Sequence, residues 1–251
     1  MNFENFNTDN YVKIYKGAYD YFHKSRKYSE ETFEIFKDEH NHLLMFNSEV
    51  SGRAPNGEFL IINVYYKITE RFNPIAVLVK KTMGKQTTYE EYLFDNTNNT
   101  MRYKFTSDHS LGEIKIFTKQ LIHISTPSIS TSLLFLKSKR FQNAAINSYK
   151  ALISDNQWDL NYNLRQEEIS VERITATPIL ITLKEKPIKA MRYRLYQYQY
   201  QEIFSKNQTQ NQNFLDIYLS KHLTIPYKID EPATGKVLEI RYFDHLEKSE
   251  E

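Results

Sequence analysis

The chain has 251 residues, and 33 Lys and Arg residues nearly balance 31 Asp and Glu residues, for a net charge of +2. A protein that binds nucleic acid through its phosphates usually carries a clear basic excess, so this charge argues against that class. The absence of Cys excludes disulfides, thiolate zinc sites and cysteine nucleophiles, and 19 Tyr and 16 Phe favour sheet over helix.

The N-terminal half, from about Tyr11 to Thr126, alternates apolar and polar residues in the way that is typical of half-buried strands. The clearest case is residues 60–68, which predict a long strand that ends before Pro74. Its apolar face carries Leu60, Ile62, Val64, Tyr66 and Ile68.

Turn residues divide the rest of this half into hairpins. We predict strands at 32–37 and 43–49 around the turn "DEHNH", and strands at 75–81 and 87–94 around Met83-Gly84-Lys85. "DNTNN" at 95–99 is a further turn, because Asn and Asp tolerate left-handed backbone. Strands follow at 101–105 and after Gly112, the latter extending through Ile114, Ile116, Ile122 and Ile124. Histidines in such a turn are ordinary solvent residues, so we predict no metal site.

A helix is predicted from about Ser128 to Lys139, because Ile129, Leu133 and Leu136 have helical spacing after a capping Ser or Thr beside Pro127. Further strands are predicted at 148–153, 158–168, 179–184, 190–203, 214–219, 225–229 and 236–243. The chain has no alternation of strands and helices, so a parallel nucleotide-binding sheet is not expected.

The segment "AMRYRLYQYQYQE" at 190–202 changes its phase of alternation after Leu195. Arg192 and Arg194 face one side of the strand, while Tyr193 and Leu195 face the other. The change of phase suggests a β-bulge, which would re-aim side chains at a functional rim. A long structural strand with its Arg and Gln residues in water is the alternative interpretation.

The C-terminal half carries a series of weak motifs: "STSLLFLKSKRF", then Ile217, Tyr218, Leu219 and Ser220, then Pro226, Tyr227 and Ile229, then Gly235 and Val237. In this order they resemble uncharacterised bacterial families built on the lipoprotein-carrier (LolA-like) half-barrel. The resemblance implies one domain over 11–243 with flexible termini at 1–10 and 244–251. The predicted elements add up to about eleven antiparallel strands and one helix, a mainly β (α+β) fold that one large curved antiparallel sheet fits best. The resemblance implies that this sheet is a half-barrel whose concave face is plugged by the short helix.

Such a half-barrel implies a container for an apolar molecule, so the predicted function is binding or carrying a hydrophobic ligand, such as a lipid or acyl chain. We expect no cofactor and no nucleic-acid partner, and peripheral association with the cell envelope stays open. The predicted ligand-binding residues lie on three segments: Leu60, Ile62, Val64, Tyr66, Ile129, Leu133, Leu136, Tyr193 and Leu195.

Two alternatives remain open. One is a cofactor-free enzyme acting on an aromatic or acyl substrate, with Tyr66, His123, Arg192 and Tyr193 as its candidate catalytic groups. No nucleophile motif accompanies any Ser, and a hydrogen-bonded structural role for His123 is the favoured interpretation. The other alternative is a structural envelope protein. The compartment is cytoplasmic if Met1 is the native start and periplasmic if a signal peptide has been removed; the N-terminus has no apolar segment typical of one.

Overall fold

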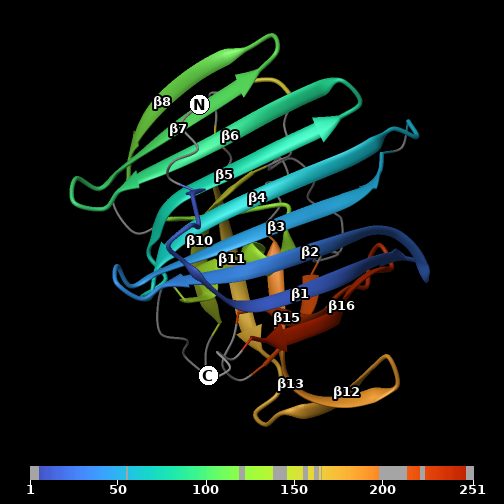
Figure 1. The fold of residues 1–251 in the computed structure, drawn as a ribbon. Coiled ribbons are helices and arrows are strands. Elements are labelled where there is room, and N and C mark those ends of the chain that lie inside the picture. The colour runs from blue at the N-terminus through green and yellow to red at the C-terminus, as the bar shows by residue number, and fades with distance from the viewer. Residues whose placement is uncertain are drawn as a thin grey trace, which may run out of the picture.

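The computed structural model describes residues 6–54, 56–118, 122–137, 146–154, 158–160, 164, 166–197, 214–220 and 224–246. These residues form a mainly β fold with one short helical segment (Figure 1). The strands of the first half are β1 (Val12–His23), β2 (Arg26–Asp38), β3 (Leu43–Arg53), β4 (Phe59–Thr69), β5 (Pro74–Met83), β6 (Gln86–Asp95), β7 (Thr100–Ser107) and β8 (Leu111–Phe117). Those of the second half are β9 (His123–Ser125), β10 (Asn147–Ile153), β11 (Gln166–Arg173), β12 (Ile179–Leu183), β13 (Lys186–Gln197), β14 (Phe214–Leu219), β15 (Pro226–Glu231) and β16 (Lys236–His245).

The sixteen strands of the described residues join in one large, open, curved sheet. Its order runs from β8 through β7, β6, β5, β4, β3 and β2 to β1, and then through β16, β15, β14, β13, β11 and β10 to β9. Neighbours are antiparallel except for the parallel pair of β9 and β10. β12 pairs with β13 alone among the described strands, as a projecting hairpin (Figure 1). The predicted antiparallel half-barrel is confirmed, with more strands than the eleven expected.

The sheet curls so that its second half lies behind the first half. In Figure 1, β1 to β8 form the front layer and β10, β11 and β13 cross behind it. A hydrogen bond spans the interior, because the backbone amide of Ile124 on β9 donates to the hydroxyl of Tyr66 on β4 at 3.1 Å. The concave face of the first half therefore faces β9, at the far end of the sheet order.

Side-chain parity on β4 is as predicted. Ile62, Val64, Tyr66 and Ile68 are all buried in the main apolar core, on the inner face of the sheet. The intervening positions, such as Asn63 and Tyr65, face the other way. Alternation along a strand thus placed these residues correctly.

The predicted helix fills the concave face, in a shorter form than expected. It consists of α1 (Ile129–Ser132) and a 3-10 turn at Leu134–Lys137; positions 138 and 139 of the prediction lie outside the described residues. Ser and Thr side chains bond to nearby groups here, for example Ser132 Oγ to the Ile129 carbonyl at 3.2 Å. Such local bonds compete with regular helix, which explains the short, irregular form.

Three strand predictions need correction. Ile114 and Ile124 share a parity but lie in two strands, β8 and β9, at opposite ends of the sheet order. Residues 158–160 are not in a strand, and β11 begins only at Gln166. The predicted bulge after Leu195 is absent through Gln197, because β13 pairs in unbroken register with β11 there; residues 198–203 lie outside the described residues.

A second, smaller apolar cluster lies on the outer face of the sheet. Phe6 is buried with Met45, Ala76 and Leu78, and its ring centroid is 6.0 Å from that of Tyr65. The segment before β1 therefore packs across the outer face of the first half. No helix in the described ranges is long and apolar enough to cross a lipid bilayer.

Candidate functional site

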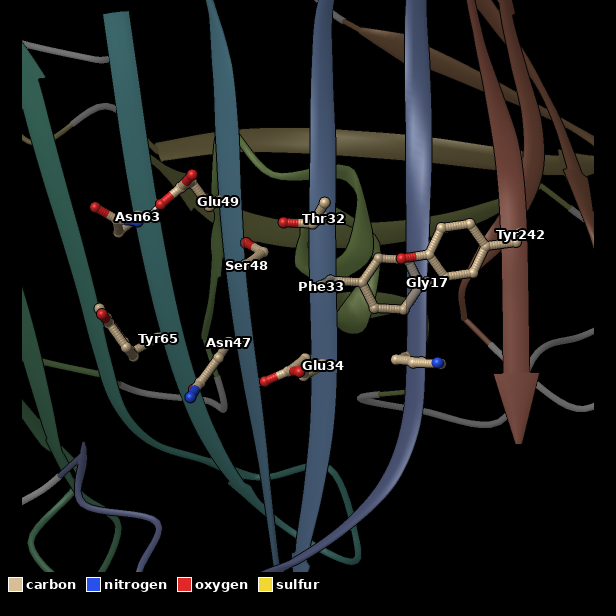
Figure 2. A pocket seen from close by; sticks show the side chains of 11 residues that line it. Gly17, Thr32, Phe33, Glu34, Asn47, Ser48, Glu49, Asn63, Tyr65 and Tyr242 are labelled. Carbon is tan, nitrogen blue, oxygen red and sulfur yellow. Dashed lines mark hydrogen bonds between the residues drawn. The ribbon is translucent and has the colours of Figure 1, made fainter. Parts of the chain in front are cut away.

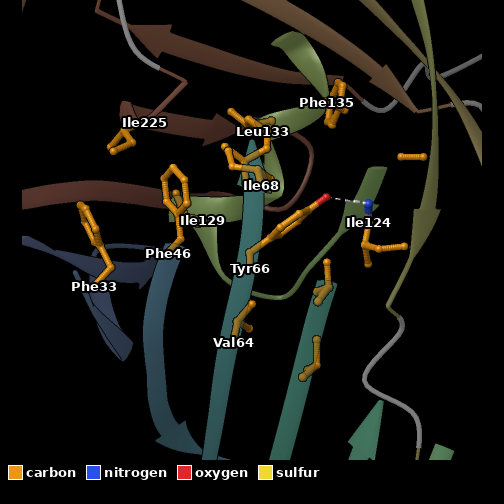
Figure 3. Packing of buried hydrophobic residues seen from close by; sticks show 14 of the residues in the cluster. Phe33, Phe46, Val64, Tyr66, Ile68, Ile124, Ile129, Leu133, Phe135 and Ile225 are labelled. Atoms are coloured by element: carbon orange, nitrogen blue, oxygen red, sulfur yellow. Dashed lines mark hydrogen bonds between the residues drawn. The ribbon is translucent and has the colours of Figure 1, made fainter. Parts of the chain in front are cut away.

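The inner face of the half-barrel gathers all nine predicted ligand-binding residues into one apolar cluster. Six of them are buried: Ile62, Val64, Tyr66, Ile129, Leu133 and Leu195. Leu60, Leu136 and Tyr193 are half-buried and pack against the same cluster. Figure 3 shows the helical segment standing over β3 and β4, with Ile129 and Leu133 close to Phe46 and Ile68. That these residues line a binding site stays a prediction.

A transverse row of paired residues crosses this inner face. From β4 to β7 the row runs through Tyr66, Val77, Tyr92 and Tyr103, each opposite the next in the strand register. The rings of Tyr92 and Tyr103 lie 5.0 Å apart between centroids and are tilted by 44°. Tyr combines an apolar ring with a hydroxyl, so the row adds polar tips to an otherwise apolar surface.

Tyr66 and His123 meet at the centre of this surface. His123 Nδ1 lies 3.3 Å from the Tyr66 hydroxyl, which also accepts the bond from the Ile124 amide (Figure 3). His123 is 1% exposed, and burial lowers its pKa from 6.5 to about 4, because the interior disfavours the charged imidazolium. The imidazole is therefore neutral at physiological pH.

The hydrogen bonds that each tautomer can make indicate which ring nitrogen of His123 carries the proton. If Tyr66 donates to Nδ1, one buried group is left over, the N–H at His123 Nε2, which has no partner among the described residues. If Nδ1 donates instead, both the tyrosine proton and the Nε2 lone pair lack partners. A buried unpaired polar group costs about 1–3 kcal/mol, so the first arrangement is favoured. It presents an N–H donor to the apolar interior.

A second polar group lies further along the inner face, on β5 and β6. Lys81 is 2% exposed and its ammonium lies 4.0 Å from the centroid of the Trp158 ring. Glu90 is also buried and accepts hydrogen bonds from Ser154 Oγ and, at 3.2 Å, from the Tyr92 hydroxyl. Burial lowers the pKa of Lys81 to about 8, against the opposing attraction of Glu90 and Asp159.

This second group was not among the site residues predicted from the sequence. Lys81 shares the parity of Val77 and Val79, and Glu90 shares that of Tyr92, so alternation along the two strands already places both charges on the buried face. The signal in the sequence was a charged residue at a strand position whose parity predicts burial.

The other two candidate catalytic residues are not brought to one place with Tyr66 and His123. Tyr193 is half-buried against the core, and burial raises its pKa. Arg192 has the opposite parity on β13, where it and Arg194 both bind the buried carboxylate of Asp216, Arg192 at 2.5 Å and Arg194 at 2.9 Å. These ion pairs hold the pKa of Asp216 below its usual value, although burial alone would raise it. The arginines of this segment thus have a structural partner.

The outer face carries a shallow polar groove of about 260 Å³ over β1 to β4. Figure 2 shows Asn47, Glu49, Asn63 and Tyr65 on its floor, with Tyr242 at one end. Asn63 Nδ2 donates to Glu49 Oε2 at 2.9 Å, so part of this polarity is already satisfied. Small-molecule sites usually enclose roughly 300 Å³ or more and are mostly apolar. This groove is smaller and polar.

No group of three His, Asp or Glu side chains in the described ranges is arranged to hold a metal ion. His40 and His42 lie exposed in the turn between β2 and β3, as predicted. His42 Nδ1 is 3.1 Å from Glu70 Oε2.

Comparison with solved structures shows similarity of fold. A β-barrel-like protein of the domain of unknown function DUF1849 from Brucella abortus aligns over 94% of this chain and 99% of its own, with a TM-score of 0.58 and 7% identity. A DUF1089 family protein from Pseudomonas aeruginosa aligns over 84% of this chain and 92% of its own, with a TM-score of 0.50 and 11% identity. No protein-family model and no curated protein matches the sequence. The β-barrel-like fold is shared with proteins of unknown function.

Proposed function

We propose that the protein binds an apolar molecule, such as a lipid or acyl chain, on the inner face of its half-barrel. The observation that carries the proposal is the buried Nε2 atom of His123, which has no hydrogen-bond partner among the described residues. A ligand carbonyl or ester oxygen would satisfy this donor while its hydrocarbon part packs against the apolar cluster. The LolA-like resemblance implies the same function and stays a prediction.

The helical segment is the element that would move to admit a ligand. It contributes Ile129, Leu133 and Leu134 to the interior through side-chain packing. Sheet strands are held by ladders of hydrogen bonds, whereas apolar contacts can be exchanged for contacts with another apolar molecule of similar volume. Because hydrogen bonds to Glu31 hold the start of the segment, the part from Leu133 onwards would act as a lid.

The alternative of a cofactor-free enzyme that uses Tyr66, His123, Arg192 and Tyr193 together has less support. Arg192 faces away from His123 and is bound by Asp216. A structural envelope role predicts that no molecule enters the interior.

The test compares two ligands of equal length, a fatty-acid methyl ester and the corresponding alkane. Native mass spectrometry of the purified protein should show a bound apolar species, and titration should show preference for the ester. His123→Leu should bind both ligands equally, whereas His109→Leu, at an exposed turn position, should keep the preference. Absence of any bound species together with no binding of either ligand would refute the proposal.

A further inference from the structure

The strand β8 forms one edge of the large sheet. It pairs with β7 and with no other strand in the described part of the chain, and it is the outermost strand in Figure 1. Two bonds fix which residues face β7: the Thr118 amide donates to the Asn99 carbonyl, and the Ser107 amide donates to the Ser110 carbonyl. Bonding alternates along an antiparallel strand, so the even-numbered residues bond to β7. The backbone groups of Leu111, Glu113, Lys115 and Phe117 therefore point to the open edge.

This edge lacks most of the features that prevent the sheet edges of two protein molecules from pairing. Natural proteins protect such strands with prolines, bulges or several charges. β8 contains no Pro, and its register with β7 is regular. Leu111 is 69% exposed and Phe117 is 78% exposed, on the same face as Glu113 and Lys115.

We infer that two copies of this chain associate through β8, pairing antiparallel about a two-fold axis at Ile114. In this register, residues at equal distances before and after Ile114 lie opposite each other in the two copies. Leu111 then faces Phe117 of the other copy, Glu113 faces Lys115, and Ile114 faces Ile114. The hydrogen-bonded pairs are those formed by the four residues whose backbone groups point to the open edge.

The charges select this register over its neighbours. A shift of two residues in one direction places Glu113 opposite Glu113, and a shift in the other direction places Lys115 opposite Lys115. Like charges directly opposite one another destabilise a strand pair, whereas opposite charges stabilise it. Of these three registers, only the one centred on Ile114 brings the exposed apolar side chains of Leu111 and Phe117 opposite each other.

Existing contacts leave these charges available. Glu113 lies 3.8 Å from Arg102 of β7, and both side chains are about half exposed, so this surface pair contributes little. A seven-residue strand edge is a small interface, and we expect association that depends on protein concentration.

Cysteine cross-linking tests the geometry, since the chain has no Cys of its own. At a non-hydrogen-bonded antiparallel pair the Cα atoms are about 4.5 Å apart, within the range of a disulfide. Ile114→Cys should therefore give a disulfide-linked dimer under mild oxidation. Ile116→Cys is the control, because the two copies of that residue would lie roughly 14 Å apart. Cross-linking of both variants alike, or of neither, would overturn the inference.

Charge reversal tests the register, measured by sedimentation equilibrium. Glu113→Lys alone and Lys115→Glu alone should each weaken self-association about tenfold or more, and an equimolar mixture of the two variants should recover it. The double variant Glu113→Lys with Lys115→Glu should also associate. Lys85→Glu, in an exposed turn, makes the same change of net charge as Lys115→Glu and should have no effect. An unmixed single variant that associates as well as wild type would contradict the proposed pairing.

Discussion

The carboxylate of Glu31 accepts a hydrogen bond of 2.8 Å from the backbone amide of Ile129, 98 positions further along the chain. The same carboxylate accepts bonds from the Tyr21 hydroxyl, Ser128 Oγ and the Ser130 amide. Glu31 has no exposed surface, and Tyr21 is itself buried. Burial and the negative charge of Glu31 raise the pKa of Tyr21 well above its ordinary value. This one side chain anchors the start of the helical segment to β2.

Removal of that anchor should destabilise the fold. Glu31→Ala leaves several buried donors without an acceptor, each at a cost of about 1–3 kcal/mol, so we expect a loss of about 3 kcal/mol or more in the free energy of unfolding. Denaturant unfolding followed by circular dichroism measures it. Glu34→Ala on the same strand removes a surface ion pair with Lys13 and should cost less than about 1 kcal/mol. Equal losses in the two variants would show that Glu31 is not an anchor.

The helical segment should be displaceable without loss of the sheet. Replacing Leu133 and Leu136 together with Ser removes apolar contacts from the interior and should increase binding of a fluorescent apolar dye. Far-ultraviolet circular dichroism should stay unchanged, because the strand ladders are untouched. Leu180→Ser, at a residue 68% exposed on β12, is the control and should not alter dye binding. Unaltered dye binding in the double variant would argue against a lid.

Stability should depend on pH through His123. Its pKa is lowered from 6.5 to about 4 in the folded protein, so between these values the unfolded chain binds more protons. The contribution of the neutral imidazole to the free energy of unfolding is complete above pH 6.5. It is lost as the pH falls towards 4, because the unfolded chain takes up a proton there that the folded protein does not. Between about pH 7 and pH 5 this residue alone should lower the free energy of unfolding by about 2 kcal/mol. His123→Gln should show a correspondingly smaller pH dependence, and a dependence equal to that of wild type would contradict the assignment.

Lys81 should be observable through Trp158, the single Trp of the chain. The ammonium lies over the indole ring, and its pKa is lowered to about 8. Selective excitation of the indole should reveal a step in emission with its midpoint near pH 8, as the charge above the ring is lost. Lys81→Met should abolish the step. Lys80→Met, on the opposite face of the same strand, should retain it, and a step that survives in Lys81→Met would have another origin.

Local patterns predicted the inner face well because burial imposes period two on each strand. The positions of Val64 and Tyr66 follow from that period alone. The turn at 95–99 was also predictable, since the side chain of Asp95 bonds the amides of Thr97 and Asn98 within the turn itself.

Strand partners were not predictable in the same way. Ile116 and Ile124 have equal parity, yet β8 and β9 lie at opposite ends of the sheet order, and nothing in a local pattern identifies a strand's neighbour. The Glu31 anchor depends on a contact across 98 positions, and the link between Tyr66 and His123 spans 57. The candidate site is therefore mostly a product of tertiary packing, and only its side-chain parity was available from the sequence.

The pairing of the first strand with the last has a mechanical consequence. Tyr15 of β1 lies opposite His245 of β16, and the Leu246 amide donates to the Ile14 carbonyl, so the outer ends of both strands meet at one point. A force that pulls these two ends apart would open the ladder one bond after another, as in a zipper, and would not load all the bonds together in shear. The ladder between β1 and β16 should thus yield under lower tension than a ladder that is loaded in shear.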